Sequence, residues 1–349
     1  MTASPPLNVL LVEPWFAGSH QSWAEGYAAA SRHEITLLTN SGEGWRSTLL
    51  HAGSKLASRV EHEPAVVLAS AMMDAARFRQ EAGLEKVPLV LYMHENQLTY
   101  DPDRFDHELA MINWRSVRSA DRVLFNSRFH LTDFFNALPH LDIEPGSVAA
   151  ARDKSQVLPV GIDLSRLDGP SRRRSDRFTV LWNHRWEADK DPAAFAEALC
   201  AITDDRFHLV LAGERRPEDP HVGRLVDHFR SRILHSGLAP EAQYAGLLRM
   251  SDVVVSTARQ EFFGVAVAEA AYCGAVPLVP NRLAYPELIP EQFHPALLYT
   301  DGELADRLLE MADQPETLVG MRPTLRAAMS RFDWSEQASR YDDVVEAVI

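Results

Sequence analysis

The chain has 349 residues, of which 46% are hydrophobic and 24% charged, so its composition excludes a disordered chain. The 35 Lys and Arg against 49 Asp and Glu give a net charge of −14, which excludes binding to nucleic acid by overall charge alone. Two distant cysteines exclude a disulfide framework and a structural zinc site. Residues 1–8 carry no basic leader and the apolar run 9–12 is too short for a membrane span, so we expect a cytoplasmic protein without a membrane segment.

Short apolar runs alternate with amphipathic stretches through the first half of the chain. The predicted buried strands are residues 9–13, 35–40, 65–70, 89–94, 123–127 and 156–160. The predicted helices between them are residues 21–31, 74–82, 105–118 and 128–138. This alternation indicates a parallel sheet with helices on both faces.

The stretch 163–177 is polar, contains Gly169, Pro170 and three consecutive arginines, and is the best linker candidate. The alternation then restarts. The predicted strands are residues 178–182, 207–212, 253–256 and 276–279. The predicted helices are residues 192–201, 222–234, 264–272, 303–313, 315–330 and 335–348, with Pro323 expected to break or kink its helix. We therefore predict an α/β chain of two Rossmann-like, doubly wound domains facing a cleft, which is the default ligand site.

Two strand tips in the first half carry polar clusters. Residues 13–20 (EPWFAGSH) form a small-residue turn that can bring backbone amides and a helix N-terminus to a phosphate, although a plain strand–helix turn is the simpler interpretation. No GxGxxG occurs there, so a dinucleotide fingerprint is absent. His94 begins the run His-Glu-Asn-Gln at the end of another strand, which favours a functional histidine over a structural one.

The matching strand tip of the second half contains Arg185 and Lys190. An arginine fork and a lysine point charge suit a diphosphate. The alternative is that both cations form surface ion pairs with Glu187 and Asp189.

Glu261 and Glu269 lie eight residues apart at the start of a predicted helix. Eight helical residues span about 12 Å, more than the roughly 5–9.5 Å between paired hydrolytic carboxylates. The pair therefore suits two contacts on one long ligand, such as sugar and ribose hydroxyls. A helix cap plus one solvated glutamate is the alternative. No metal-binding DxD at a strand tip, Walker loop, HExxH or GxSxG occurs.

Together these motifs resemble a retaining glycosyltransferase of the GT-B fold with the Glu-x7-Glu motif, which is Glu261 and Glu269 here. A closer resemblance covers nearly the whole chain. Residues 12–20, 92–100, 123–130, 183–192 and 261–288 resemble the glycosyltransferase-like domain-containing protein 1 group, whose animal members include a tRNA-queuosine α-mannosyltransferase. That group usually carries two glycines where this chain has Ala17 and Gly18.

The resemblance implies four regions. Residues 1–165 are an acceptor-side Rossmann-like domain, 166–177 a linker, 178–330 a nucleotide-sugar-binding domain, and 331–349 a helix that returns to the first domain.

It also implies the site. Catalytic roles fall to His94, Arg185, Lys190 and Glu261, and donor binding to Gly18, Arg185, Lys190, Glu261, Phe262, Phe263, Gly264 and Glu269. The arginine and lysine neutralise the leaving diphosphate, and the histidine lies beside the donor sugar. No metal and no cofactor are expected, and the implied substrate is GDP-mannose.

The resemblance implies transfer of mannose to queuosine in a tRNA anticodon. Expected acceptor contacts are His20, Asn96, Gln97, Arg115 and Arg128, with further tRNA contacts from Arg118, Arg122, residues 172–174 and the tryptophans Trp15, Trp45 and Trp114. The alternative is that the arginines lie on solvated helix faces and the tryptophans belong to the core. Base-pocket candidates are residues 215–217 and 244–247; these residues alone do not distinguish guanine from uracil. One alternative is a small-molecule or lipid acceptor, and a lipid acceptor would use an amphipathic helix at 105–118. A second is a non-catalytic nucleotide-sugar or RNA-binding module. A third is a hydrolysing or epimerising relative.

Overall fold

A computed structural model describes residues 5–41, 44–101, 103–170, 177–214 and 220–349. The chain divides into two compact units. Unit 1 contains residues 1–163 and 332–349, and unit 2 contains residues 164–331.

Unit 1 is built on a parallel six-stranded sheet in the order β2-β1-β3-β4-β5-β6. The strands are β1 (Asn8–Glu13), β2 (Glu34–Thr39), β3 (Val66–Ser70), β4 (Leu89–Met93), β5 (Arg122–Phe125) and β6 (Ser155–Val157). Successive side chains of β1 alternate between the two faces and are buried on both, as the apolar run Val9–Val12 requires of a parallel strand covered by helices. The strand order reverses between β1 and β3, and such a switch point is where doubly wound sheets bind ligands.

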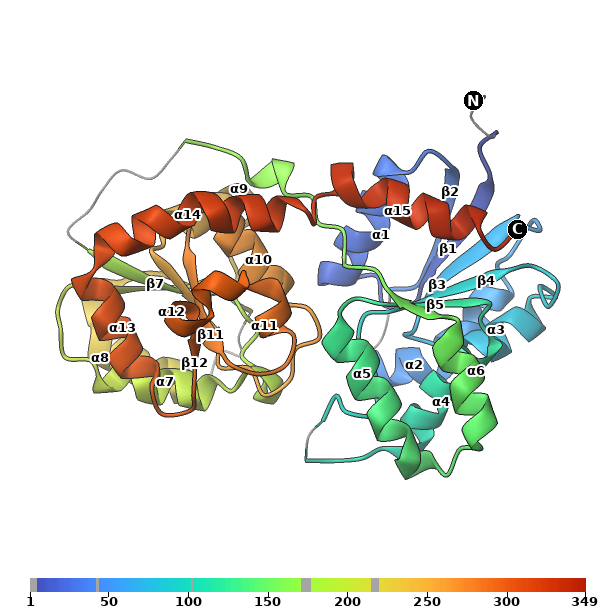
Figure 1. The fold of residues 1–349 in the computed structure, drawn as a ribbon, viewed down its shortest axis with the longest axis horizontal. Coiled ribbons are helices and arrows are strands. Elements are labelled where there is room, and N and C mark those ends of the chain that lie inside the picture. Colours follow the sequence, from blue (N-terminus) through green and yellow to red (C-terminus); the bar gives the residue numbers. More distant parts are fainter. Residues whose placement is uncertain (1–4, 42–43, 102, 171–176, 215–219) are drawn as a thin grey trace. The chain divides into compact units, whose positions relative to one another are not determined.

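Helices cover both faces of this sheet (Figure 1). They are α1 (Gly18–Ala30), α2 (Trp45–Ala57), α3 (Ala75–Glu81), α4 (His107–Ser119), α5 (Arg128–Ala137), α6 (Pro145–Asp153) and α15 (Trp334–Glu346). Helices α2, α3 and α4 contact one another on one face, and α1 and α15 contact each other on the other (Figure 1). The main hydrophobic core of the unit lies beneath the first group and includes Leu91, Phe78 and Trp114.

The C-terminal helix α15 is held by close ring packing. A Cβ added to Gly26 would lie 2.0 Å from the Trp334 ring, and one added to Gly161 would lie 2.5 Å from it. Both positions therefore need glycine for the indole to fit. The Tyr27 hydroxyl donates to Asp342 (2.8 Å), which ties α15 to α1.

Unit 2 repeats the architecture with a second parallel sheet in the order β12-β11-β10-β7-β8-β9. Its strands are β7 (Phe178–Trp182), β8 (Phe207–Leu211), β9 (Ile233–Ser236), β10 (Val253–Val255), β11 (Val276–Pro280) and β12 (Leu298–Tyr299). The switch point here lies between β7 and β10. Their carboxyl ends lead into the loops that carry Lys190 and Glu261, which the topology thereby brings together.

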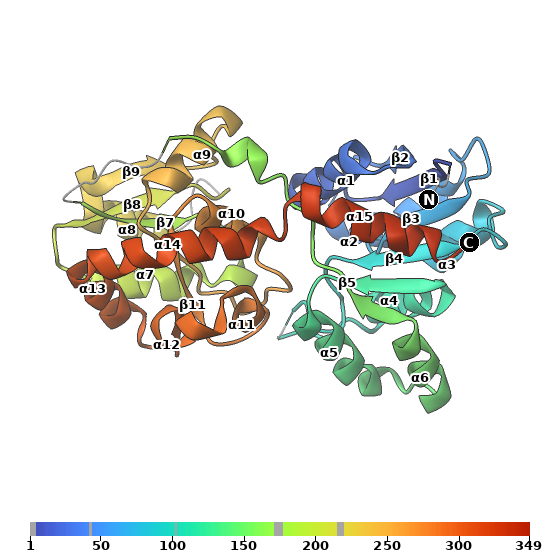
Figure 2. The ribbon, with the colours of Figure 1, turned by 45° about the horizontal axis from the view of Figure 1, so that its top comes forward.

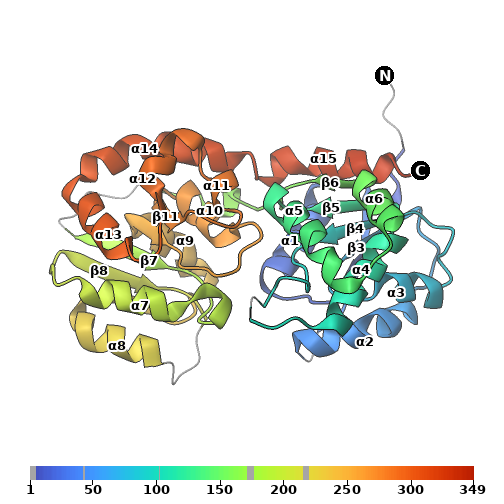
Figure 3. The same cartoon turned by 60° about the horizontal axis from the view of Figure 1, so that its bottom comes forward.

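The helices of unit 2 also form two layers. They are α7 (Pro192–Ala201), α8 (Pro220–Phe229), α9 (Glu241–Met250), α10 (Val265–Tyr272), α11 (Tyr285–Leu288), α12 (His294–Leu297), α13 (Leu304–Asp313) and α14 (Pro315–Ser330). Helix α10 packs on α14 (Figure 2), and α7 packs on α8 (Figure 3).

The structure confirms the predicted α/β class and corrects some elements. Helix α8 ends at Phe229 and strand β9 begins at Ile233, so the single helix predicted over 222–234 is wrong. Pro323 does not break α14, which continues to Ser330. Helices α2, α6, α9, α11 and α12 were not predicted. No helix among the described residues is both long and apolar enough to cross a membrane.

Candidate active site

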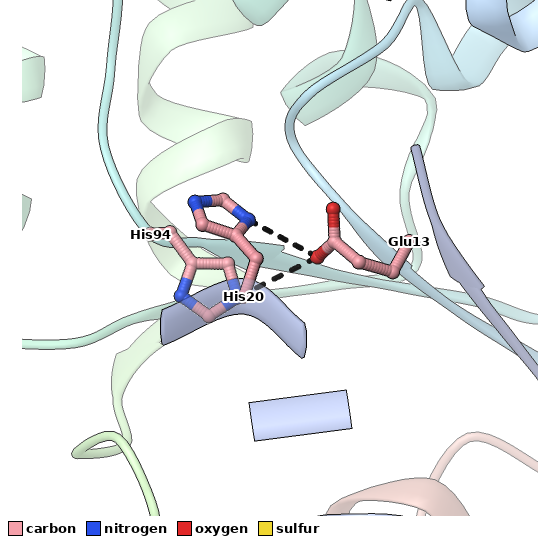
Figure 4. A group of neighbouring side chains, drawn as sticks. All are labelled: Glu13, His20 and His94. Carbon is pink, nitrogen blue, oxygen red and sulfur yellow. Dashed lines mark hydrogen bonds and ion pairs between the residues drawn. The ribbon is translucent and has the colours of Figure 1, made fainter. Parts of the chain in front are cut away.

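Three side chains of unit 1 meet beside its switch point (Figure 4). Glu13 ends β1 and is fully buried, His20 lies in the first turn of α1, and His94 directly follows β4. The Glu13 carboxylate accepts a hydrogen bond from the Trp15 amide (2.8 Å) through Oε1. Its Oε2 lies 3.2 Å from His20 Nδ1 and 3.9 Å from His94 Nε2. A buried carboxylate is costly unless paired, and these contacts supply its partners.

His20 joins two carboxylates. Its Nδ1 faces Glu13 and its Nε2 lies 3.3 Å from Oε2 of Glu95. Burial by itself lowers the pKa of the ring, but the two carboxylates outweigh burial and raise the pKa of His20 to about 10. His20 is therefore an imidazolium at neutral pH.

His94 has the opposite character. Burial, reinforced by the charges of His20 and His130, holds the pKa of His94 well below its usual range. Its ring lies 4.2 Å from the His20 ring and edge-on to Trp23. Among the described residues, nothing hydrogen-bonds its buried Nε2. A neutral imidazole with an unsatisfied nitrogen suits hydrogen bonding to a hydroxyl.

Glu13, His20 and His94 also offer ligand atoms within 4.8 Å of one another, a spacing that could hold a metal ion. Metal ligation requires a deprotonated imidazole, whereas the two carboxylates stabilise the proton on His20. The donor set therefore fits an ion-paired histidine better than a metal centre.

The other predicted residues of unit 1 are dispersed. Gly18 begins α1 with φ +53°, and Arg128 is exposed at the start of α5. The Asn96 side chain is fully buried and accepts from the amides of Leu98 and Thr99.

Gln97 is also buried, and Arg115 donates two hydrogen bonds to Asp74 (3.0 and 2.7 Å). Their roles in acceptor binding stay predictions.

The tryptophans expected to stack on bases differ in exposure. Trp114 is 3% exposed within the core, so its predicted stacking role is wrong. Trp45 is 46% exposed, and its ring centroid lies 6.4 Å from that of Tyr100. Residues 172–174 and 215–217, predicted for tRNA and base contacts, lie outside the described residues.

In unit 2, Lys190 and Glu261 form an ion pair with Nζ and Oε2 3.1 Å apart. Lys190 also donates to the carbonyl of Gln260 (3.0 Å) and lies 3.2 Å from Asp189. Burial works to raise the pKa of Glu261, but Lys190 and His184 hold it below its usual value. The Arg185 side chain is half exposed and pairs with Glu187 (2.9 Å). The predicted surface ion pairs of Arg185 are therefore present.

Glu261 also binds the turn that leads into α10. Its Oε1 accepts from the amides of Phe263 (3.2 Å) and Gly264 (3.0 Å). Gly264 has φ +101°, a left-handed conformation that glycine adopts without strain. Phe262 and Phe263 are buried. The N-cap residue of α10 is Gly264 and the helix has no side-chain cap, so Glu261 does not form the helix cap of the alternative interpretation; it binds the turn that precedes the helix.

Glu269 is buried within α10 and bound on both oxygens. Arg166 pairs with Oε1, and the Tyr244 hydroxyl donates to Oε2 (2.8 Å). Asn183 in turn donates to the Tyr244 oxygen (3.2 Å). Glu269 is therefore oriented by a hydrogen-bond network. The alternative prediction of a solvated glutamate is wrong.

Comparisons with known proteins place these features in a family. Residues 8–162 match the family model described as tRNA-queuosine alpha-mannosyltransferase N-terminal, and residues 177–314 match glycosyl transferases group 1. Among solved structures, Anabaena Alr3699/HepE in complex with UDP and glucose superposes with a TM-score of 0.73 at 17% identity, covering 98% of this chain and 100% of that one. Sucrose-phosphate synthase from Thermosynechococcus elongatus superposes with a TM-score of 0.77 at 14% identity, covering 97% and 98%. The fold and these matches define a glycosyltransferase of the GT-B fold.

Two relatives of known activity, both mannosyltransferases, are similar to this chain. The tRNA-queuosine alpha-mannosyltransferase of Drosophila melanogaster is 29% identical, covering 99% of this chain and 97% of the relative. The GDP-mannose:cellobiosyl-diphosphopolyprenol alpha-mannosyltransferase of Xanthomonas campestris is 26% identical over 57% of this chain and 54% of its own length. Residues 8–162 thus match a tRNA-queuosine alpha-mannosyltransferase N-terminal domain, and residues 177–314 match a glycosyl transferases group 1 domain. The predicted fold and family are confirmed.

Sequence reasoning did not assign roles to Glu13, Glu95, Asn183 or Arg166. Glu13 lies only seven residues before His20 at the same strand end, and this proximity in the sequence could have indicated that the two side chains meet. Arg166 lies 103 residues from Glu269 and carries no local signal.

Proposed function

We propose that this protein transfers mannose from GDP-mannose to queuosine in the anticodon of a tRNA, with retention of configuration. The observation that carries the proposal is the match of residues 8–162 to the tRNA-queuosine family model, together with a relative that aligns along nearly the whole chain. We propose the cytoplasm as its location, because the acceptor is a tRNA.

The donor is a nucleotide sugar, and two relatives support GDP-mannose in particular. Both are named as mannosyltransferases, and the name of the second specifies GDP-mannose. We assign donor binding to unit 2, where residues 177–314 match glycosyl transferases group 1.

Lys190 and Arg185 perform the electrostatic part of the reaction in this proposal. Negative charge grows on the diphosphate as the glycosidic bond breaks, so cations fixed beside it stabilise the transition state more than the ground state. Glu261, Asp189 and the Gln260 carbonyl hold the Lys190 ammonium in place before the donor arrives.

Glu261 binds the donor sugar. The amides of Phe263 and Gly264 donate to its Oε1 and so fix the carboxylate, whose remaining lone pairs accept hydrogen bonds from sugar hydroxyls. Glu269 accepts hydrogen bonds from the ribose hydroxyls while Arg166 and Tyr244 fix its orientation.

His94 lies beside the donor sugar and hydrogen-bonds one of its hydroxyls. Its ring is neutral, so it adds no charge at the reacting carbon. The leaving phosphate oxygen takes the proton of the acceptor hydroxyl, and no protein nucleophile takes part. We propose that this transfer needs no metal and no cofactor.

A lipid acceptor fits the structure less well. The helix considered for a membrane surface is α4, and its apolar side chains Leu109, Ile112 and Trp114 are buried in unit 1 rather than exposed. Arg118 and Arg122 are exposed where α4 ends and β5 begins, at the edge of the sheet opposite to His94.

The test is mass spectrometry of tRNA nucleosides after incubation of the purified protein with GDP-mannose and queuosine-containing tRNA. We expect queuosine to gain one hexose, and the same tRNA carrying guanosine in place of queuosine to gain none. If queuosine gains nothing while GDP still raises the melting temperature, the tRNA acceptor is wrong and the glycosyltransferase assignment stands.

A further inference from the structure

Glu95 is the most exposed member of the charged cluster in unit 1. It follows His94 at the carboxyl end of β4, and 17% of its side chain is exposed. Its Oε2 is held by His20 Nε2 at 3.3 Å, whereas its Oε1 has no hydrogen-bond partner in the part of the chain that the structure describes. One carboxylate oxygen is thus fixed and the other is available to a ligand.

The cluster carries more negative than positive charge. Glu13 and His20 already form a matched pair, and His94 is neutral. Glu95 adds a second carboxylate to a single imidazolium, which leaves one negative charge in a partly buried place. A charge in such a place needs a partner, and that partner must be a cation.

This charge excludes one class of ligand. A phosphate placed directly against the exposed oxygen of Glu95 would be repelled by this carboxylate. A metal ion at Glu13, His20 and His94 would have to displace the proton of His20. An organic ammonium group requires neither, because it approaches the exposed oxygen of Glu95 and leaves the histidine as it is.

Queuosine carries such a group. Its side chain is a secondary amine that joins the deazaguanine ring to a cyclopentene diol, and a secondary amine is protonated at neutral pH. The hydroxyls of this diol lie only a few bonds from the ammonium. A carboxylate beside the reacting centre can therefore hold the cation while a hydroxyl reaches the donor sugar.

We infer that Glu95 binds the ammonium group of the queuosine side chain, and that His20, fixed by Glu13, is the positioning residue for this carboxylate. The inference rests on the proposed function and adds the group by which the acceptor is recognised. A second observation points to a ligand here: the buried Nε2 of His94 lacks a hydrogen-bond partner among the described residues and lies in the same cluster. The ammonium neutralises the charge of Glu95, and the hydroxyl of the donor sugar proposed above hydrogen-bonds His94.

The test compares steady-state kinetics of Glu95→Gln with those of the wild type, varying queuosine-containing tRNA at saturating GDP-mannose. Loss of a charge-assisted contact predicts a KM for the tRNA at least about tenfold higher. The shift in melting temperature caused by GDP should not change. Glu95→Asp, which keeps the charge on a shorter side chain, should recover part of the loss. Glu61→Gln, at an exposed glutamate of unit 1, is the matched control and should behave like the wild type.

His20→Gln tests the positioning role with a second readout. It removes the imidazolium but keeps hydrogen-bonding capacity, so the KM for the tRNA should rise while the GDP-induced shift in melting temperature stays. Activity should survive dialysis against EDTA.

The inference is overturned if Glu95→Gln keeps the wild-type KM for the tRNA. It is also overturned if EDTA abolishes activity and Zn²⁺ restores it, because a metal ion rather than an ammonium group then neutralises the cluster. If the wild type transfers no hexose to queuosine, the proposed function fails first and this inference fails with it.

Discussion

Each unit places an ion pair beside the switch point of its sheet, yet the cations differ. In unit 2 the cation at the switch point is Lys190, whose charge is permanent at physiological pH. In unit 1 it is His20, whose charge exists because two carboxylates hold its proton. The Lys190 ammonium of unit 2 thus suits the anionic diphosphate proposed above, whereas the excess carboxylate of unit 1 suits the ammonium group proposed above.

The largest effect should come from removing the permanent cation. Lys190→Ala takes away the charge that stabilises the leaving diphosphate, so we expect kcat to fall by about 10²–10³-fold. Release of GDP from GDP-mannose in the presence of acceptor tRNA measures it. Lys86→Ala, at an exposed lysine of unit 1, is the control. Activity of Lys190→Ala within about twofold of the wild type would show that the donor does not meet this lysine.

Glu269→Gln should separate donor binding from chemistry. The amide cannot pair with Arg166, which loses its partner on α10. We expect a KM for GDP-mannose about tenfold higher with a smaller change in kcat, because ribose contacts are equal in the ground and transition states. A fall in kcat at unchanged KM would instead place Glu269 at the reacting centre.

The pH dependence of thermal stability should show whether His20 in unit 1 is protonated. The pKa of His20 is raised to about 10 by Glu13 and Glu95, so its pairing stabilises the fold fully below about pH 6.5, the ordinary histidine value, and is lost as pH rises through 10. We expect the difference in melting temperature between the wild type and His20→Gln to be largest near pH 6 and to shrink towards pH 10. A constant difference across this range would mean that His20 is neutral in the fold.

The smallest effect should come from Tyr244→Phe. This change removes the hydroxyl that donates to Glu269 and accepts from Asn183, a loss of about 1 kcal/mol per hydrogen bond. We expect GDP to bind several-fold more weakly, as measured by calorimetry, with little change in the KM for the tRNA. An equal loss for both substrates would indicate general destabilisation, which thermal unfolding would detect.

The sequence supports the fold prediction well because the strands are buried on both faces. Apolar runs such as Val9–Val12 and the polar residues at their ends are local signals, and they located Lys190, Glu261 and His94 at strand tips. Helix α9 was not predicted, because only Leu248 among its side chains is buried and the periodic signal is weak.

The partners of the site residues could not be predicted in the same way. Glu95 meets His20 across 75 residues, and Arg166 meets Glu269 across 103. These contacts depend on strand order and on the packing of a linker segment, neither of which leaves a pattern in nearby residues. The burial of Asn96 was missed for a related reason: residue type alone does not tell which face of an element is covered.

The position of α15 in the chain has a consequence for biosynthesis. Unit 2 is an insertion within unit 1, and the ribosome makes all of unit 2 before it makes Trp334. Until then the rings of Trp23 and Tyr27 have no Tyr341 to cover them, and the cavity between Gly26 and Gly161 has no indole. The nascent chain therefore exposes an aromatic surface until its last residues emerge, and a product that stops before Trp334 keeps that surface exposed as a target for chaperones and proteases.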